Sequence, residues 1–153
     1  MCRDMPRLAL YQPDIPQNVG AAMRLCACLG VPLDIIEPCG FPWDPRKIRA
    51  AAMDYLDHAD LTRHSSWEAF RARCKSDQNR LVLLTTKAAR PYWDADLRAG
   101  DILLAGRESA GVPDYVHEAA DIRVTIPMNG AMRSLNVINA CAMVLGEARR
   151  QLR

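Results

Sequence analysis

The sequence has no zinc-binding pattern, although it contains six cysteines. None of the six forms a CxxC pair, and none is matched by a histidine at the spacing that zinc sites use. We therefore expect no metal centre in this protein.

Long apolar stretches are absent as well. The first residues, MCRDMPRLALY, include an acidic side chain and no apolar core of signal-peptide length, and no segment approaches the apolar length that crosses a bilayer. We therefore expect a cytoplasmic protein with no membrane segment, whose reduced thiols act mostly as small core side chains.

The sequence also has little excess charge. Its 20 basic and 18 acidic residues give a formal net charge of +2, which is too small to indicate nucleic-acid binding. The basic residues are almost all arginine, whose planar guanidinium suits bidentate phosphate contacts. A genome that prefers arginine codons explains the same bias equally well.

Length and composition favour a single domain over residues 1–153. A chain of 153 residues can bury most of its surface around one core but is short for two. Half of the residues are apolar and a quarter are charged, which is ordinary for a globular protein.

Short apolar runs alternate with segments of helical periodicity. This alternation favours an α/β fold with a mostly parallel sheet flanked by helices. The expected strands are Leu8–Tyr11, Leu33–Ile36, Leu81–Thr85, Ile102–Ala105 and Ile122–Ile126.

The expected helices are placed by their ends and by their apolar faces. The first has Asn18 as its N-cap and Gly30 just beyond its last turn. Two further helices are expected after Pro45 and over Trp67–Cys74. The last helix begins at Ser134, and it carries an apolar face at helical spacing that comprises Leu135, Ile138, Cys141, Ala142, Leu145 and Ala148.

The GxGxxG turn of dinucleotide and methyl-donor sites is missing after the first strand. The chain reads QPDIPQNVGAAMR there, a proline-containing loop that opens a helix with Arg24 in its second turn. Taken alone, Asn18 is an ordinary helix cap and Arg24 an ordinary solvated side chain.

Two later segments carry the polar and glycine residues that a ligand site requires. AGRESAGVP follows an apolar strand, where α/β folds bind ligands and where glycine lets the backbone approach them. IPMNGAMRSLNVINA joins the last strand to the last helix through a polar loop. Taken alone, the second segment is a loop that ends in an N-capping serine, Ser134.

Together, the segments IPQNVGAAMR, GRESAGVP and IPMNGAMRSLNVINA closely resemble the three signature motifs of the SPOUT superfamily of knotted methyltransferases. Between them, IIEPCGFPWD and MDYLDHA are similar to the branch that methylates the wobble ribose of tRNA. The resemblance extends from Leu8 to the last helix.

The resemblance implies a C-terminal deep trefoil knot whose loops bind S-adenosylmethionine. Residues that match the cofactor contacts of similar enzymes are Leu84, Gly106, Ile126 and Ser134. The resemblance also implies a homodimer in which the partner subunit completes each active site, with the first and last helices as the candidate interface.

The implied reaction transfers the methyl group to a ribose 2′-hydroxyl without a metal and leaves S-adenosylhomocysteine. Arg24 matches the arginine that similar enzymes assign to this step. Because arginine stays protonated at any ordinary pH, we expect Arg24 to bind a phosphate and stabilise the developing alkoxide rather than to act as a base.

Other side chains of these segments are candidates for shaping the site or for binding RNA. They are Asn18, Glu108, Arg133 and Asn136, with Arg107 and Lys87 as possible contacts to the RNA backbone. Taken singly, each of the cations is better interpreted as solvated surface charge. Tyr11, Trp43 and Tyr55 would stack on splayed bases if they are exposed, although burial is the commoner state of such rings.

The expected substrate is the first anticodon nucleotide of tRNA, cytidine or uridine 34, in leucine isoacceptors. One alternative is a ribose methyltransferase that acts on another tRNA site or on ribosomal RNA. The other is a non-catalytic knotted RNA-binding protein. The intact Arg24, the glycine at Gly106 and the Ser134-Leu135-Asn136 match favour an active enzyme.

Overall fold

The computed structural model describes residues 4–132 and 135–153. Within these residues, six strands form one sheet in the order β3-β2-β1-β5-β4-β6. The strands are β1 Arg7–Tyr11, β2 Leu33–Ile36, β3 Leu61–His64, β4 Arg80–Leu84, β5 Asp101–Ala105 and β6 Ile122–Val124. The α-helices are α1 Pro16–Leu29, α2 Pro45–Ala52, α3 Trp67–Ser76, α4 Asp114–Ala119 and α5 Val137–Gln151, and the 3₁₀ helices are η1 Met53–His58 and η2 Tyr92–Asp94.

All five strand pairings are parallel, which confirms the expected α/β class and parallel sheet. The central strand β1 pairs with β2 on one side and with β5 on the other, so Ala9 lies between Asp34 and Leu104. The chain therefore builds outward from β1 to β3 in one half of the sheet. In the other half β4 comes first, β5 is inserted between β4 and β1, and β6 is added at the edge beside β4.

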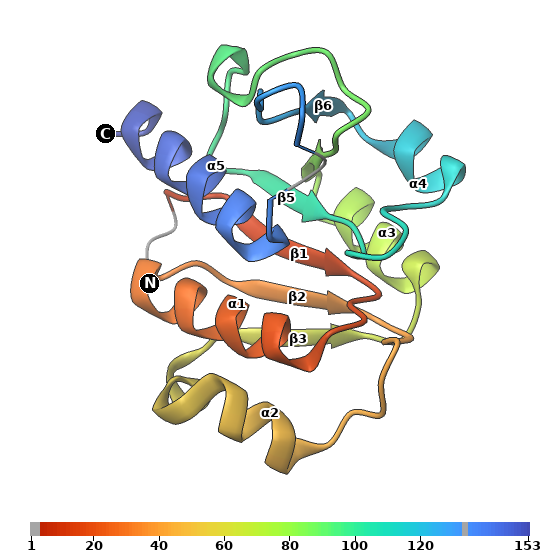
Figure 1. Ribbon diagram of the computed structural model, residues 1–153, viewed down its shortest axis with the longest axis vertical. Helices are drawn as coiled ribbons and strands as arrows, with labels where there is room; N and C mark the ends of the chain where they lie inside the picture. The colour runs from red at the N-terminus through yellow and green to blue at the C-terminus, as the bar shows by residue number, and fades with distance from the viewer. Residues whose placement is uncertain (1–3, 133–134) are drawn as a thin grey trace.

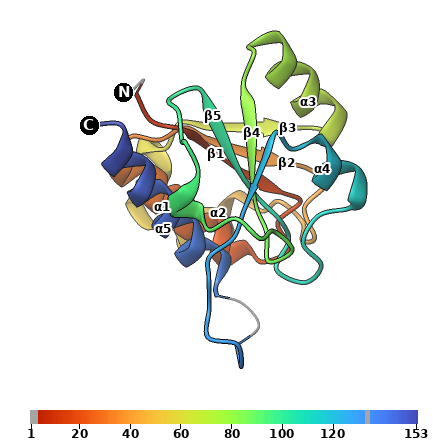
Figure 2. The ribbon, with the colours of Figure 1, turned by 90° about the horizontal axis from the view of Figure 1, so that it is seen from above.

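Helices cover both faces of the sheet, with α1, α2 and α5 on one face and α3 and α4 on the other (Figures 1 and 2). Side chains alternate between the faces along each strand, because successive residues of a strand point to opposite sides. Leu8 and Leu10 of β1 pack under α1, α2 and α5, whereas Ala9 and Tyr11 pack under α3 and α4. The central strands β1, β4 and β5 are mostly apolar on both faces because both faces are covered.

Helix α1 begins earlier than the sequence predicts. Pro16 occupies its first turn and Ile15 is the N-cap residue, without a side-chain hydrogen bond. Asn18 is therefore inside the helix, and the prediction that it is the N-cap is wrong. A proline supplies the helical φ and has no N–H to satisfy, so it can open the helix without a polar cap. Gly30 ends the helix in the left-handed conformation, as expected.

Helix α5 begins later than predicted. Its N-cap is Asn136, whose side-chain oxygen accepts hydrogen bonds from the backbone N–H groups of Ile138 (2.9 Å) and Asn139 (3.2 Å). The prediction of a start at Ser134 is wrong, and Leu135 precedes the helix with 42% of its surface exposed. Ser134 itself lies outside the described residues. The predicted apolar face is buried at Ile138, Cys141, Leu145 and Ala148.

Strand β3 and helix α4 were not predicted. The sequence of β3, LTRH, has only one aliphatic residue. Its buried residue, His64, is polar and is paired with a partner in the interior. His64 Nε2 lies 2.8 Å from Asp34 Oδ1, and Arg7 donates to both oxygens of the same carboxylate. This buried arrangement lets β3 join the sheet without an apolar sequence pattern, because a buried carboxylate is tolerated when it is paired and hydrogen-bonded.

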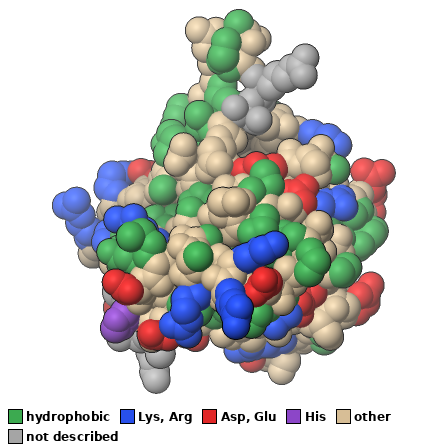
Figure 3. Space-filling model, turned by 60° about the horizontal axis from the view of Figure 1, so that its bottom comes forward, with side chains coloured by type: hydrophobic (Ala, Val, Ile, Leu, Met, Phe, Trp, Pro, Cys, Tyr) green, Lys and Arg blue, Asp and Glu red, His purple; other side chains and the backbone are tan. Residues whose placement is uncertain are grey.

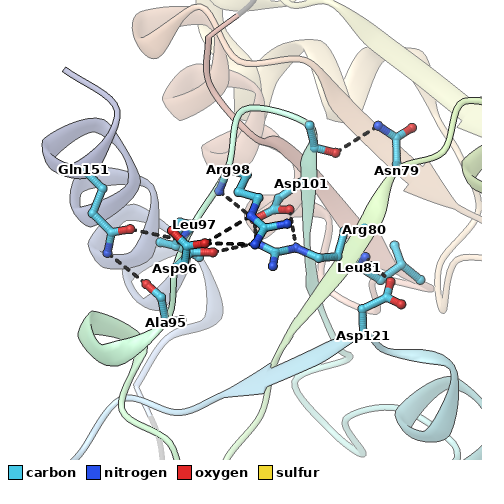
Figure 4. Close-up of polar contacts among 11 residues, drawn as sticks. Asn79, Arg80, Leu81, Ala95, Asp96, Leu97, Arg98, Asp101, Asp121 and Gln151 are labelled. Atoms are coloured by element: carbon cyan, nitrogen blue, oxygen red, sulfur yellow. Dashed lines mark hydrogen bonds and ion pairs between the residues drawn. The ribbon is translucent and has the colours of Figure 1, made fainter.

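The end of α5 is hydrogen-bonded to the connection between β4 and β5. The Gln151 side chain accepts from the backbone N–H of Leu97 and donates to the carbonyl of Ala95, both at 3.0 Å (Figure 4). Beside it, Arg80 donates to both carboxylate oxygens of Asp101 at 2.7 Å. Asp101 is only 2% exposed, so this ion pair ties the start of β4 to the start of β5 in the interior.

Replacing Arg80 by methionine is expected to lower the free energy of unfolding by about 3 kcal/mol, because the Asp101 carboxylate would stay buried without its cation. Urea denaturation measures this change. The matched control is Arg98→Met, which removes an exposed ion pair with Asp96 and is expected to change stability by less than about 1 kcal/mol. Equal effects of the two substitutions would contradict a stabilising role for the buried pair.

Candidate functional site

A cavity of about 820 Å³ opens at the carboxyl ends of β4, β5 and β6. This is the edge of a parallel α/β sheet at which ligands bind, and the volume is typical of small-molecule sites. Its walls come from three connections and from the first turn of α5. The lining residues are 83–87, 105–112, 114, 117, 125, 126, 128, 135–137 and 140.

The cavity brings together three of the four residues predicted to hold the cofactor. Leu84 ends β4, Gly106 follows β5, and Ile126 follows β6, and all three line the cavity. Ser134, the fourth, lies outside the described residues, as does Arg133. Leu84 and Ile126 give the cavity an apolar wall, and Gly106 contributes backbone without a side chain.

Gly106 is required by a close approach of backbone. A Cβ atom at this position would lie 2.7 Å from the carbonyl carbon of Gly111, which is shorter than real contacts allow. Arg107 and Gly111 exchange two backbone hydrogen bonds of 2.9 and 3.0 Å, and Gly111 has a φ of +60°. The loop after β5 is therefore a tight turn that folds back on itself and forms part of the cavity wall.

Asn136 connects the three polar segments at the mouth of the cavity. Its side-chain nitrogen donates to Asn18 Oδ1 at 3.2 Å and to Glu108 Oε1 at 3.3 Å. Glu108 also accepts from the backbone N–H of Val137 at 3.4 Å. The helix α1, the loop after β5 and the start of α5 therefore meet at one amide side chain.

The loop before α1 is joined to the same mouth by Asp14. Its carboxylate accepts a hydrogen bond from the Ser109 hydroxyl, and this bond lowers the pKa of Asp14 below its ordinary value. A carboxylate with a lowered pKa stays charged near neutral pH. Sequence patterns did not predict this contact, because the two residues are 95 positions apart.

Tyr11 is buried at the end of β1, with 1% of its surface exposed, so it presents no ring face to a nucleobase. Burial and a hydrogen bond of 2.9 Å with the Tyr115 hydroxyl raise its pKa to about 12. Trp43 and Tyr55 are half-buried. Each has a guanidinium over its ring, from Arg63 at 4.2 Å and from Arg24 at 5.2 Å respectively.

Arg24 is exposed on α1 and is not among the residues that line the cavity. One guanidinium nitrogen lies 3.9 Å from Met53 Sδ, and the group stands over the ring of Tyr55. The structure therefore separates Arg24 from Leu84, Gly106 and Ile126 within one chain, whereas Asn18 reaches the cavity mouth through Asn136.

Positive charge at the cavity comes from Arg107 and Lys87, both of which line it. On the side of the molecule where α2 lies, Lys and Arg side chains are interspersed with Asp and Glu (Figure 3). Asp114 and His117 of α4 also line the cavity and were missed. The signal that could have located them is the segment Asp114–Ala119, which follows Pro113 as a short helix.

No group of three His, Cys, Asp or Glu side chains within 4–132 and 135–153 is arranged to hold a metal ion. In the same part of the chain, no helix combines the length and the apolar character needed to span a membrane.

Residues 5–146 match the family model described as the SpoU rRNA methylase family. The chain is 63% identical over 145 residues to the tRNA (cytidine(34)-2′-O)-methyltransferase of Beijerinckia indica, an alignment that covers 95% of this chain and 91% of that protein. It is 40% identical over 150 residues to the protein of the same name from Escherichia coli K12, with 97% and 94% of the two chains covered.

Two solved structures are similar to this one. The first belongs to a study of the 2′-OH methylation of C/U34 on tRNA. It superposes with a TM-score of 0.91 and 39% identity, over 98% of this chain and 97% of that chain. The second is the SpoU methyltransferase AviRb of Streptomyces viridochromogenes in complex with AdoMet. Its TM-score is 0.87 and its identity 27%, over 97% of this chain and 60% of that one.

Replacing Asn136 by alanine is expected to lower the free energy of unfolding by about 1 kcal/mol, because α5 loses the side chain that caps its first turn. The control is Asn136→Ser, since serine can still cap the helix although it no longer reaches Asn18 and Glu108. Thermal or urea denaturation compares the two. An alanine variant as stable as the wild type would contradict the assigned cap.

Proposed function

Because the chain belongs to the SpoU rRNA methylase family, we propose that it transfers a methyl group from S-adenosylmethionine to the ribose 2′-oxygen of nucleotide 34 in tRNA. The expected substrates are leucine isoacceptors with cytidine or uridine at that position, in the cytoplasm. The observation that carries the proposal is the cavity, which is lined by two of the three segments that resemble the family motifs, GRESAGVP and IPMNGAMRSLNVINA. High identity to proteins named for this reaction supports it.

The residues of the cavity fit S-adenosylmethionine. Its volume of about 820 Å³ suits a nucleoside with an amino-acid tail, and Leu84 and Ile126 provide an apolar slot for a base. The backbone around Gly106 can approach the ligand closely. We assign these three residues, together with Ser134, to cofactor binding. When bound, the cofactor supplies a methyl group on a positively charged sulfur, which leaves with the bonding electron pair as a neutral thioether.

Arg24 serves the reaction as a fixed cation in this proposal. The ribose hydroxyl must be positioned and must lose its proton as the new O–C bond forms. Arginine does not accept that proton, because its guanidinium is already protonated. It binds the phosphate beside the target ribose and stabilises negative charge that develops on the 2′-oxygen, and the proton passes to solvent or to another group.

Asn18, Glu108 and Asn136 shape the mouth of the cavity. Their mutual hydrogen bonds hold α1, the loop after β5 and α5 together at the place where RNA must enter. Arg107 and Lys87 line the cavity and are proposed as contacts to the RNA backbone, as is Arg133.

We also propose that residues 1–153 form a single domain with a trefoil knot near the C-terminus. The connection between β4 and β5 supports this. Its residue Tyr92 donates a backbone hydrogen bond to Thr125, and its residues Ala95 and Leu97 bond to Gln151 at the end of α5. The connection thus contacts the chain at Thr125, before the start of α5, and at Gln151, at the end of α5.

A homodimer completes each active site in this proposal. Within one chain, Arg24 lies outside the cavity that would hold the methyl donor. A partner related by two-fold symmetry can supply the missing arginine, because an isologous contact places the same helix of each subunit near the other. The exposed surfaces of α1 and α5 are the proposed interface.

The first test is methyl transfer from labelled S-adenosylmethionine to total tRNA from cells that lack this activity, followed by mapping of the labelled nucleotide. Label at the ribose of nucleotide 34 is the expected result. Arg24→Ala is expected to lower kcat by about 100-fold or more, because one charge-stabilising group is lost, while the affinity for S-adenosylhomocysteine stays unchanged. Arg73→Ala on α3 is the matched control and should retain full activity.

Other outcomes of this test identify the alternatives. Label at another tRNA position or in ribosomal RNA would show that the substrate differs from the proposed one. Tight binding of S-adenosylhomocysteine with no methyl transfer to any RNA would contradict the enzyme hypothesis and support a non-catalytic RNA-binding protein.

The composite site is tested by combining two inactive variants, Arg24→Ala and Gly106→Ala. The second is expected to lose cofactor binding, because a Cβ at position 106 meets the Gly111 backbone. When each carries its own affinity tag and only mixed dimers are purified, one of the two sites receives an intact arginine and an intact cavity. Activity should then return to about half of the wild-type value per dimer. No recovery would place Arg24 and the cavity of each site in the same subunit.

A further inference from the structure

We propose that Tyr55 is a positioning residue for Arg24, and that Gly20 makes this possible by letting the two helices that carry them approach closely. This inference rests on the proposed function, since it assigns a supporting role around the arginine of that reaction. Neither Gly20 nor Tyr55 touches the cavity, so their role is exerted through Arg24.

The contact between α1 and α2 is set by Gly20. A Cβ on this residue would lie 2.4 Å from Ala51 Cβ and 2.5 Å from the Ala51 carbonyl carbon. Any side chain at position 20 would therefore push the last turn of α2 away from α1. Gly20 and Arg24 are four residues apart, so they lie one above the other on the same face of α1.

Immediately after Ala51 and Ala52 the chain turns sharply. Met53 ends α2 with a φ of +56° and a ψ of −133°, a conformation that residues with a side chain rarely adopt. The 3₁₀ helix η1 then runs over the same face of α1. The turn brings two of its side chains to Arg24, namely the Met53 sulfur at 3.9 Å and the Tyr55 ring at 5.2 Å.

The ring of Tyr55 holds the guanidinium in a defined orientation. A cation over an aromatic face is attracted by the negative charge above the ring, and arginine can lie flat on that face. Arg24 is exposed and has no hydrogen bond to a carboxylate among the described residues. Its guanidinium contacts the Tyr55 ring and the Met53 sulfur instead. These contacts orient the arginine without neutralising its charge, which leaves it free to bind a phosphate.

The test measures kcat, the KM for tRNA, and the affinity for S-adenosylhomocysteine in the full-length protein. Tyr55→Leu is expected to lower kcat by about tenfold or more, because a misplaced catalytic group loses much of its effect. Because Arg24 also binds a phosphate of the RNA, the KM for tRNA should rise by a smaller factor than kcat falls, and the cofactor affinity should stay unchanged. Tyr55→Phe keeps the ring face and should retain the wild-type kcat. Trp93→Leu, at an exposed aromatic residue, should leave all three quantities unchanged.

A second measurement keeps the shape of the ring and changes only its charge distribution. Phenylalanines with one, two or three fluorine atoms, incorporated at position 55, weaken the negative face of the ring stepwise. kcat is expected to fall stepwise with fluorination. In the background of Arg24→Lys, Tyr55→Leu should have a much smaller effect than in the wild type, because the two residues act together.

Three results would overturn the inference. One is a constant kcat across the fluorinated series. Another is an unchanged kcat with a raised KM for tRNA in Tyr55→Leu, which would show that Tyr55 contacts a base of the RNA instead. The third is an equal effect of Tyr55→Leu with and without Arg24. An inactive wild-type protein would refute the proposed function as well, whereas an active one with these results would refute only the role of Tyr55.

Discussion

Parallel pairing of all six strands is the constraint on which the rest of the structure depends. Parallel strands all end at the same edge of the sheet, so the connections after β1, β4, β5 and β6 emerge side by side. Three segments that are far apart in the sequence thereby become neighbours. Asn136 can reach Asn18, 118 residues away, only because both lie at this edge.

The sequence predicted those parts of the structure that depend on local pattern. The apolar runs of β1, β2, β4 and β5 and the turn at Gly30 are read directly from neighbouring residues. Strand β3 was missed because its inward His64 pairs with Asp34 across the sheet, so no apolar alternation marks it. Asn18 was misplaced because a proline two residues earlier opens α1, and sequence spacing alone does not choose between two possible starts.

The residues of the candidate site likewise fall into those that the sequence predicted and those that depend on tertiary packing. Leu84, Gly106 and Ile126 were predicted through motif resemblance, and the fold gathers them in one cavity. The surroundings of Arg24 could not be predicted, because they depend on how closely α2 packs on α1 and on the turn at Met53. Spacing along the chain does not determine such a packing distance. The link between Asp14 and Ser109 was missed for the same reason.

The two halves of the sheet carry different parts of the site. The cavity belongs to the connections after β4, β5 and β6, and Arg24 with its partners belongs to the helices that follow β1 and β2. The halves are paired along β1 and β5, and at the cavity edge Asn136 and Asp14 add side-chain hydrogen bonds between them. In evolutionary terms the halves can therefore diverge at different rates. Substitutions in α2 and η1 would then alter the surroundings of Arg24 while the lining of the cavity stays the same.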